Sequence, residues 1–294
     1  MTKFNFYKAM KLLSKRIELK VLALSVTLVI MGITAFGNSP LASQKQIGMF
    51  LNSTTCVVLE SGINPYNGFI KEAVEKHWKT TPFEFIDEVE FEARRFDSRY
   101  SFLVQMVNIY NADPEGVSYN YLSLVMGGSH KNLVNMPELC SVPFLYSDDS
   151  SLDYEYAIPA IVKFMQKHVK KLEKKRFFIL MSGLSYYNSS GFKEKQLLMN
   201  RDKMAPDAYS IDKINAVYPY FVKLLSATEI KAELAENPKN ALFHFHVGPS
   251  KNKAAGKCFE MIFDVEGNLY YYKSRMITNA NKDGFNMQDF KRIR

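Results

Sequence analysis

Hydrophobic and polar residues alternate over two short stretches of this chain, residues 83–86 and 222–225. The first stretch leads into Asp87 and the second into Ser226, and each of these residues has a Glu three positions further on. This spacing is typical of a capping box, in which the two side chains satisfy free backbone N–H groups at the start of a helix. The pattern therefore predicts the same strand, cap and helix twice.

The similarity extends on both sides of the two stretches, at a separation of about 140 residues. Each copy reads as β-α-β-α-β-β, in which alternating strands and helices indicate an α/β layer with a mixed sheet and the last two strands a hairpin. We predict two similar α/β lobes that arose by internal duplication; the alternative is a chance likeness of two common local patterns. The further matching segments are 56–60 with 196–200, 67–78 with 207–218, 100–107 with 240–247 and 119–127 with 259–267.

Between the two copies, apolar residues recur with helical spacing over residues 153–175 and predict an amphipathic helix. The run RFFILMSG that follows, residues 176–183, has five consecutive apolar residues after Arg176 and predicts a buried strand. The resulting organisation is a targeting segment at 1–37, a first α/β lobe at 38–150, a connecting helix at 151–176 and a second α/β lobe at 177–294.

The N-terminal segment has the pattern of an export signal. Residues 1–20 carry six basic side chains and one acidic one, and an uncharged apolar run follows from 21 to 37. Ala35 and Gly37 suit the small-residue positions of a signal-peptidase site, which would make Asn38 the mature start. An uncleaved anchor with its basic end in the cytoplasm is the alternative. We predict an exported protein in the periplasm or at the outer membrane, or one anchored in the inner membrane and facing the periplasm.

Charge and cysteine content narrow the possible partners. The whole chain is formally +8, but residues 1–37 contribute +5 (six minus one), so the remainder carries only +3. Nucleic acid is not an expected partner, and membrane contact is expected only through residues 21–37 if they are retained. The basic run at 167–176 reads as a solvated helix face, or else as a patch for a polyanion or membrane surface. Three widely spaced cysteines permit one disulfide with one thiol left over.

The candidate chemistry lies in the predicted hairpin of the second copy. Side chains alternate along a strand, so His244 and His246 share one face while the aromatic residues between them share the other. If the turn centres near residue 252, His246 lies opposite Cys258 and His244 opposite Glu260. These four residues could ligate zinc or copper. The alternative is a polar outer face with two surface histidines and an ordinary thiol.

Several segments resemble known proteins. The stretches NPYNGFIKEAVEKHW with TPFEFI (64–78 and 81–86), YPYFVKLLS (218–226), FHFHVGP (243–249) and CFEMIFD (258–264) resemble a family of exported bacterial cell-envelope proteins. The order of strands and helices in each lobe is similar to small α/β domains such as the amino-terminal domain of TolB-like proteins. The resemblance implies an envelope location and motifs that are structural rather than catalytic.

No nucleophile elbow or phosphate-binding glycine motif is present in the sequence, and we assign no catalytic residues. We therefore favour a non-enzymatic envelope protein that binds a protein partner or supports a periplasmic or outer-membrane assembly. The alternative is a ligand- or metal-binding protein, including a metal-dependent enzyme, that uses the histidine face or a cleft between the lobes.

Overall fold

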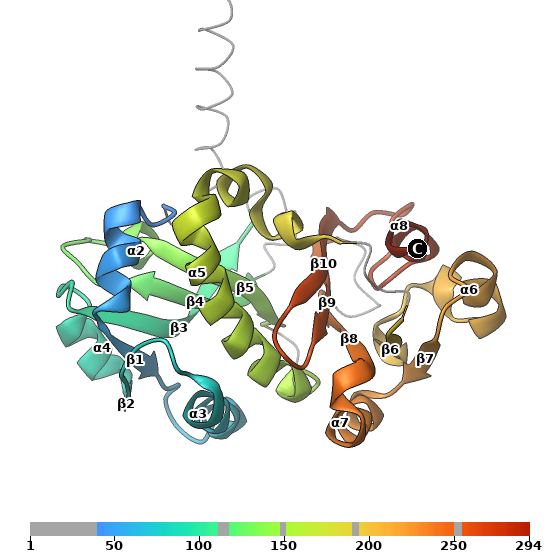
Figure 1. The fold of residues 1–294 in the computed structure, drawn as a ribbon, viewed down its shortest axis with the longest axis horizontal. Coiled ribbons are helices and arrows are strands. Elements are labelled where there is room, and N and C mark those ends of the chain that lie inside the picture. Colours follow the sequence, from blue (N-terminus) through green and yellow to red (C-terminus); the bar gives the residue numbers. More distant parts are fainter. Residues whose placement is uncertain (1–39, 111–117, 148–150, 190–193, 250–254) are drawn as a thin grey trace, which may run out of the picture. The chain divides into compact units, whose positions relative to one another are not determined.

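The computed structural model describes residues 40–110, 118–147, 151–189, 194–249 and 255–294 (Figure 1). The predicted targeting segment at 1–37, whether signal peptide or anchor, lies outside the described residues. Within the described ranges, no helix has both the length and the apolar character that a membrane crossing requires.

The first sheet has five strands in the order β2-β1-β3-β4-β5. Strand β1 runs parallel to both of its neighbours, whereas β4 is antiparallel to β3 and β5. The strands are β1 (Thr54–Val58), β2 (Phe83–Ile86), β3 (Tyr100–Ile109), β4 (Ser118–Met126) and β5 (Glu138–Tyr146).

The second sheet repeats this arrangement, in the order β10-β9-β8-β6-β7 with β6 parallel to β7 and β8 and the remaining pairs antiparallel. The predicted fold class, two similar α/β lobes with mixed sheets, is confirmed, and the shared topology is consistent with duplication. Each sheet also has a fifth, antiparallel strand that the sequence pattern did not predict. The strands are β6 (Gln196–Asn200), β7 (Val222–Leu225), β8 (Ala241–Val247), β9 (Lys257–Asp264) and β10 (Leu269–Met276).

The helices occupy equivalent places in the two chain segments: α3 and α4 follow β1 and β2, and α6 and α7 follow β6 and β7. Both predicted caps are present, because Asp87 accepts from the Glu90 N–H and Ser226 from the Glu229 N–H. Of these two caps, Ser226 has the reciprocal bond of a capping box and Asp87 does not, since the Glu90 carboxylate instead pairs with Arg94. The helices are α2 (Gln44–Leu51), α3 (Pro65–His77), α4 (Glu88–Arg94), α5 (Ile158–Ser182), α6 (Ile211–Val217), α7 (Ala227–Glu236) and α8 (Met287–Ile293).

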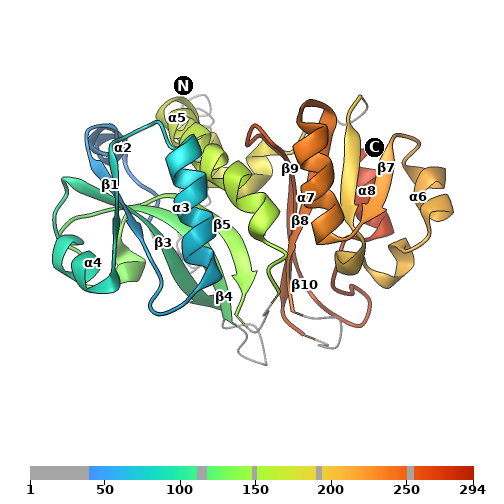
Figure 2. The same ribbon diagram turned by 90° about the horizontal axis from the view of Figure 1, so that it is seen from below.

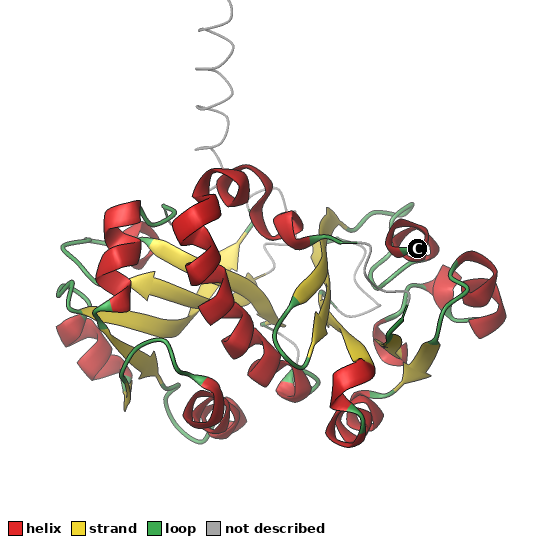
Figure 3. Ribbon diagram, in the orientation of Figure 1, coloured by secondary structure: helices red, strands yellow, loops and turns green. Residues whose placement is uncertain are grey.

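The connecting helix α5 is longer than the sequence predicted. It continues through a kink at Lys175 and ends at Ser182, so the predicted strand at 176–183 is wrong (Figure 3). A short apolar run does not by itself distinguish a strand from a helix. In the described structure, residues 176–182 pair with no strand, and Ile179 is their one buried residue.

The two sheets share one hydrophobic core. The largest cluster of buried side chains joins residues of α3, α5 and the first sheet to residues of α7 and the second sheet. Figure 2 shows where these helices lie beside the two sheets. Tyr156 packs edge-on against Phe243, and Phe164 packs against Phe263. A second cluster lies on the other face of the second sheet, beneath α6 and α8.

Candidate functional site

The predicted histidine face exists, but its strand register differs from the prediction. His246 lies opposite Glu260, and His244 lies opposite Ile262. The predicted pairs, His246 with Cys258 and His244 with Glu260, are therefore wrong by two residues. The parity was correct, because a shift of one residue would have turned the aromatic side chains of β8 away from the large core.

This face is buried. His244 and Glu260 are fully buried and His246 is 8% exposed, so the alternative of a polar outer face with surface histidines is wrong. The same face carries Leu242 and Ile262, which join the cluster beneath α6 and α8. These helices come from chain segments far from the hairpin, so the alternation of the hairpin could not indicate that both of its faces are covered.

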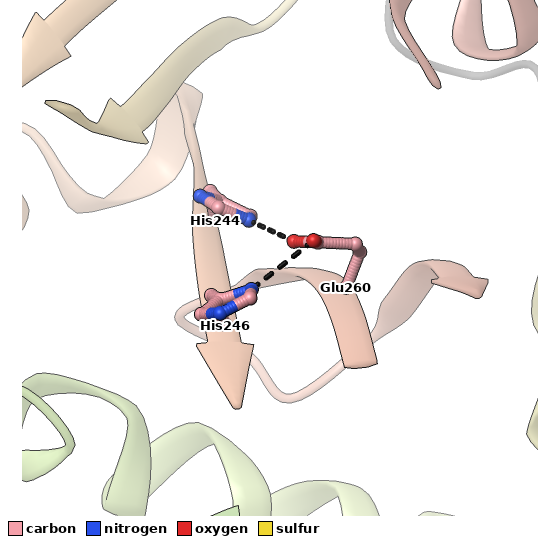
Figure 4. A group of neighbouring side chains, drawn as sticks. All are labelled: His244, His246 and Glu260. Carbon is pink, nitrogen blue, oxygen red and sulfur yellow. Dashed lines mark hydrogen bonds and ion pairs between the residues drawn. The ribbon is translucent and has the colours of Figure 1, made fainter. Parts of the chain in front are cut away.

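Glu260 bridges the two histidines (Figure 4). One carboxylate oxygen lies 2.7 Å from His244 Nε2, and the other lies 3.1 Å from His246 Nδ1. On its other side, His246 Nε2 lies 3.2 Å from an oxygen of Asp283. The carboxylate is thus held between two imidazoles in the interior of the second lobe.

The network extends beyond the residues that the sequence indicated. Arg275 reaches Glu260 at 3.4 Å and Asp289 at 3.1 Å, and Lys273 forms an ion pair with Asp289. Arg275 and Lys273 belong to β10, which pairs with β9 so that Lys273 lies opposite Glu260. The unpredicted fifth strand therefore explains why the sequence did not place these two cations at the site.

The charges of the network set the protonation of the two histidines. Burial lowers the pKa of His246, but the charges of Glu260 and Asp283 outweigh burial and raise this pKa to about 10. Burial dominates at His244 and lowers its pKa. For Glu260, burial is outweighed by the charge of His246 and by hydrogen bonds from both histidines, so its pKa is lowered. At neutral pH, an imidazolium and a neutral imidazole therefore face one carboxylate.

The neutral His244 must donate its Nε2 proton to Glu260, which leaves Nδ1 as an acceptor. Among the described residues, no group forms a hydrogen bond with this Nδ1, although it is buried. The ring instead packs edge-on against Phe285 at a centroid distance of 5.1 Å.

Three of the four predicted metal ligands come together. His244, His246 and Glu260 each offer a ligand atom, and these atoms lie within 4.8 Å of one another. This donor set suits zinc, although an ion would have to displace the proton of His246 and the two bonds to Glu260. Cys258 is not part of the group, and burial raises the pKa of its thiol. All three cysteines of the chain are buried free thiols, so the disulfide that the sequence permitted is not formed.

A separate pocket of about 380 Å³ is lined by residues of α3, α5 and α7, and of the segments beside them. Figure 2 shows where these three helices lie in the fold. Charged residues form its rim: Lys76 pairs with Glu72 at 2.6 Å and Lys231 with Glu155 at 2.5 Å. The apolar part of the lining includes Phe69, Ala73, Tyr156, Leu234, Ala235 and Phe243.

Comparison of the chain with protein-family models, curated proteins and solved structures gave no match. The resemblance to exported envelope proteins and TolB-like domains therefore stays a prediction. The function has to be argued from the geometry of this chain.

Proposed function

We propose that this protein is a non-enzymatic binding protein of the bacterial cell envelope, which receives an apolar segment of a protein partner in the pocket between α3, α5 and α7. The pocket is the observation that carries this proposal, because both lobes and the connecting helix contribute to it. Its location in the periplasm, at the outer membrane or on an inner-membrane anchor rests on the sequence of residues 1–37.

The lining of the pocket favours a peptide segment as ligand. Aromatic and aliphatic side chains form its interior, and ion pairs at its rim can exchange partners with charged groups beside an inserted side chain. A central apolar pocket with a polar rim is the usual anatomy of a protein interface.

The buried network in the second lobe is better explained as a structural element than as a catalytic centre. Its three carboxylates, Glu260, Asp283 and Asp289, face three cations contributed by β8 and β10. Balanced charges with mutual hydrogen bonds are the arrangement that burial of ionic groups requires. None of its residues lines the pocket between α3, α5 and α7, and only Lys273 lines the second pocket, of about 590 Å³, beside Arg292.

Photocrosslinking tests the proposed pocket. A benzophenone amino acid in place of Glu72, an exposed residue of the lining, is expected to form an adduct with the partner in cells. A second substitution, Ala235→Trp, fills the pocket from the exposed face of α7 and is expected to abolish the adduct. Ala232→Trp is the matched control, because Ala232 is exposed on the same helix but does not line the pocket. An adduct that survives Ala235→Trp would exclude the pocket as the binding site.

The clustering of His244, His246 and Glu260 supports a second candidate, a metal-binding protein. Zinc analysis of the purified protein decides it. Stoichiometric zinc that is lost in His244→Ala/His246→Ala, with the fold intact by circular dichroism, would support this function. Unmutated protein that holds no metal after incubation with zinc and dialysis would remove it.

A further inference from the structure

The end of α5 exposes an apolar surface that no other described element covers. Beyond the kink at Lys175, Phe177 is 67% exposed and Phe178 55% exposed. Leu180 and Met181 are also exposed, at 40% and 51%. Large apolar side chains gathered in one exposed place usually mark an interaction surface, whereas single ones need no explanation.

Basic residues precede this surface along α5. The run at 167–176 contains six basic residues and one acidic residue, and it leads directly into Phe177. The Lys175 ammonium lies 5.7 Å from the ring centre of Phe178. We call this surface the α5 patch; it consists of Lys171, Lys174, Lys175, Phe177, Phe178, Leu180 and Met181, all exposed. Lysines beside Phe and Leu are the composition of helices that lie in a membrane interface, where the apolar groups enter and the ammonium groups stay at the headgroups.

The position of the patch along the fold points to the same partner. Arg176, which adjoins Phe177, donates to the carbonyl oxygen of Ala42 at 2.7 Å and to that of Leu41 at 3.3 Å. The start of the described chain is therefore fixed beside the patch. The apolar run at 21–37 ends only four residues before Leu41, a distance that an extended chain spans in about 14 Å at most.

We propose that the α5 patch lies on the surface of a bilayer that contains anionic phospholipid. A bilayer entered by residues 21–37 would be within reach of the patch, so membrane contact is not confined to the N-terminal run. A second copy of the chain fits the patch less well, because a symmetric contact would bring two basic runs together.

Depth-dependent quenching tests the proposal. The full chain is reconstituted in phosphatidylcholine vesicles with and without phosphatidylglycerol, and the lipids carry bromine on their acyl chains. Phe178→Trp places a reporter in the patch, and Phe221→Trp places the control at a residue that is 77% exposed on the second lobe. The chain has one natural Trp, Trp78, which is buried, and its signal is subtracted using the unsubstituted protein.

The Phe178→Trp reporter is expected to show a blue shift and bromine quenching, and the Phe221→Trp reporter to show neither. Quenching should be stronger with phosphatidylglycerol and should weaken in Lys171→Gln/Lys174→Gln/Lys175→Gln, since each lysine near an anionic surface changes affinity about fivefold. Equal quenching of the two reporters, or no quenching of either, would overturn the proposal. A blue shift that increases with protein concentration in detergent, together with a doubled molecular mass of the protein, would also overturn the proposal. Those results would indicate self-association instead.

Discussion

His168 is a histidine that the fold keeps neutral. It lies on α5 and is 3% exposed, and its Nδ1 is 2.9 Å from the hydroxyl of Tyr187. Burial raises the pKa of Tyr187, so the phenol stays protonated and donates to the imidazole. Burial, with a smaller effect from the charge of Lys171, lowers the pKa of His168 to about 4.

This shift predicts an acid-sensitive contribution to stability. Between pH 6.5 and 4 the unfolded chain binds a proton at His168 and the native protein does not. The contribution of neutral His168 to the unfolding free energy is therefore complete above about pH 6.5. As the pH falls toward 4, up to about 3 kcal/mol of this free energy is lost. His168→Gln keeps an acceptor for Tyr187 and removes the titration. The difference in urea unfolding free energy between the two proteins should shrink as the pH falls, whereas a difference that is constant with pH would contradict the assignment.

Glu260 is the residue on which the buried network depends most. In Glu260→Gln, the cations of His246 and Arg275 lose the carboxylate between them and stay in the interior. We expect a loss of about 3–5 kcal/mol of unfolding free energy, the usual cost of removing one partner of a buried ion pair. The exposed Glu75 on α3 provides the control, since Glu75→Gln should change the free energy by less than about 0.5 kcal/mol. Equal effects of the two substitutions would show that the network contributes nothing specific.

Among the helices and strands, the sequence predicted those features that depend on residues close together in the chain. The caps at Asp87 and Ser226 were predictable because capping depends on residues three positions apart. The strands β5 and β10 lack an equally clear local pattern, because β5 contains Pro143 and β10 contains the polar residues 273–275. The end of α5 is a helix and not the predicted buried strand, because a run of apolar residues does not indicate which other elements will cover it.

The candidate site was predictable to the same limited extent. Alternation placed His244, His246 and Glu260 on one face, and the structure brings them together. The site also contains Arg275 of β10 and, from the segments after it, Asp283 and Asp289. The hydrophobic pattern of the sequence does not predict these contacts. The burial of this face likewise depends on α6 and α8, which are distant in sequence.

The capping box of α7 gives a test at this scale. Ser226 Oγ accepts from the Glu229 N–H at 3.3 Å, and the Glu229 carboxylate accepts from the Ser226 N–H at 2.7 Å. Ser226→Ala should cost about 1 kcal/mol of unfolding free energy, the usual effect of losing a cap. Thr228→Ala, an exposed change in the same turn, should be neutral or slightly stabilising, because Ala is the better helix former. A larger loss for Thr228→Ala than for Ser226→Ala would contradict the role of the cap.

At the scale of the molecule, the two lobes are similar in topology but are not independent in packing. The Tyr156 hydroxyl donates to the carbonyl oxygen of His244 at 2.8 Å, and the Lys257 N–H donates to the Tyr119 hydroxyl at 2.6 Å. Tyr119 also packs edge-on against Phe259. The aromatic face of β8 and β9 is thus completed by residues of the first lobe and of the segment that leads into α5.

This shared core predicts that the lobes unfold together. A chain of residues 183–294 would expose Phe243, Phe245 and Phe263, which lie in the common cluster. We expect that fragment to bind anilinonaphthalene sulfonate and to lack a cooperative urea transition. In the whole protein, amide hydrogens of β3 and β8 should exchange with the same global free energy, because neither sheet retains its core without the other. A fragment that unfolds cooperatively and leaves the dye unbound would instead show that each lobe completes its own core.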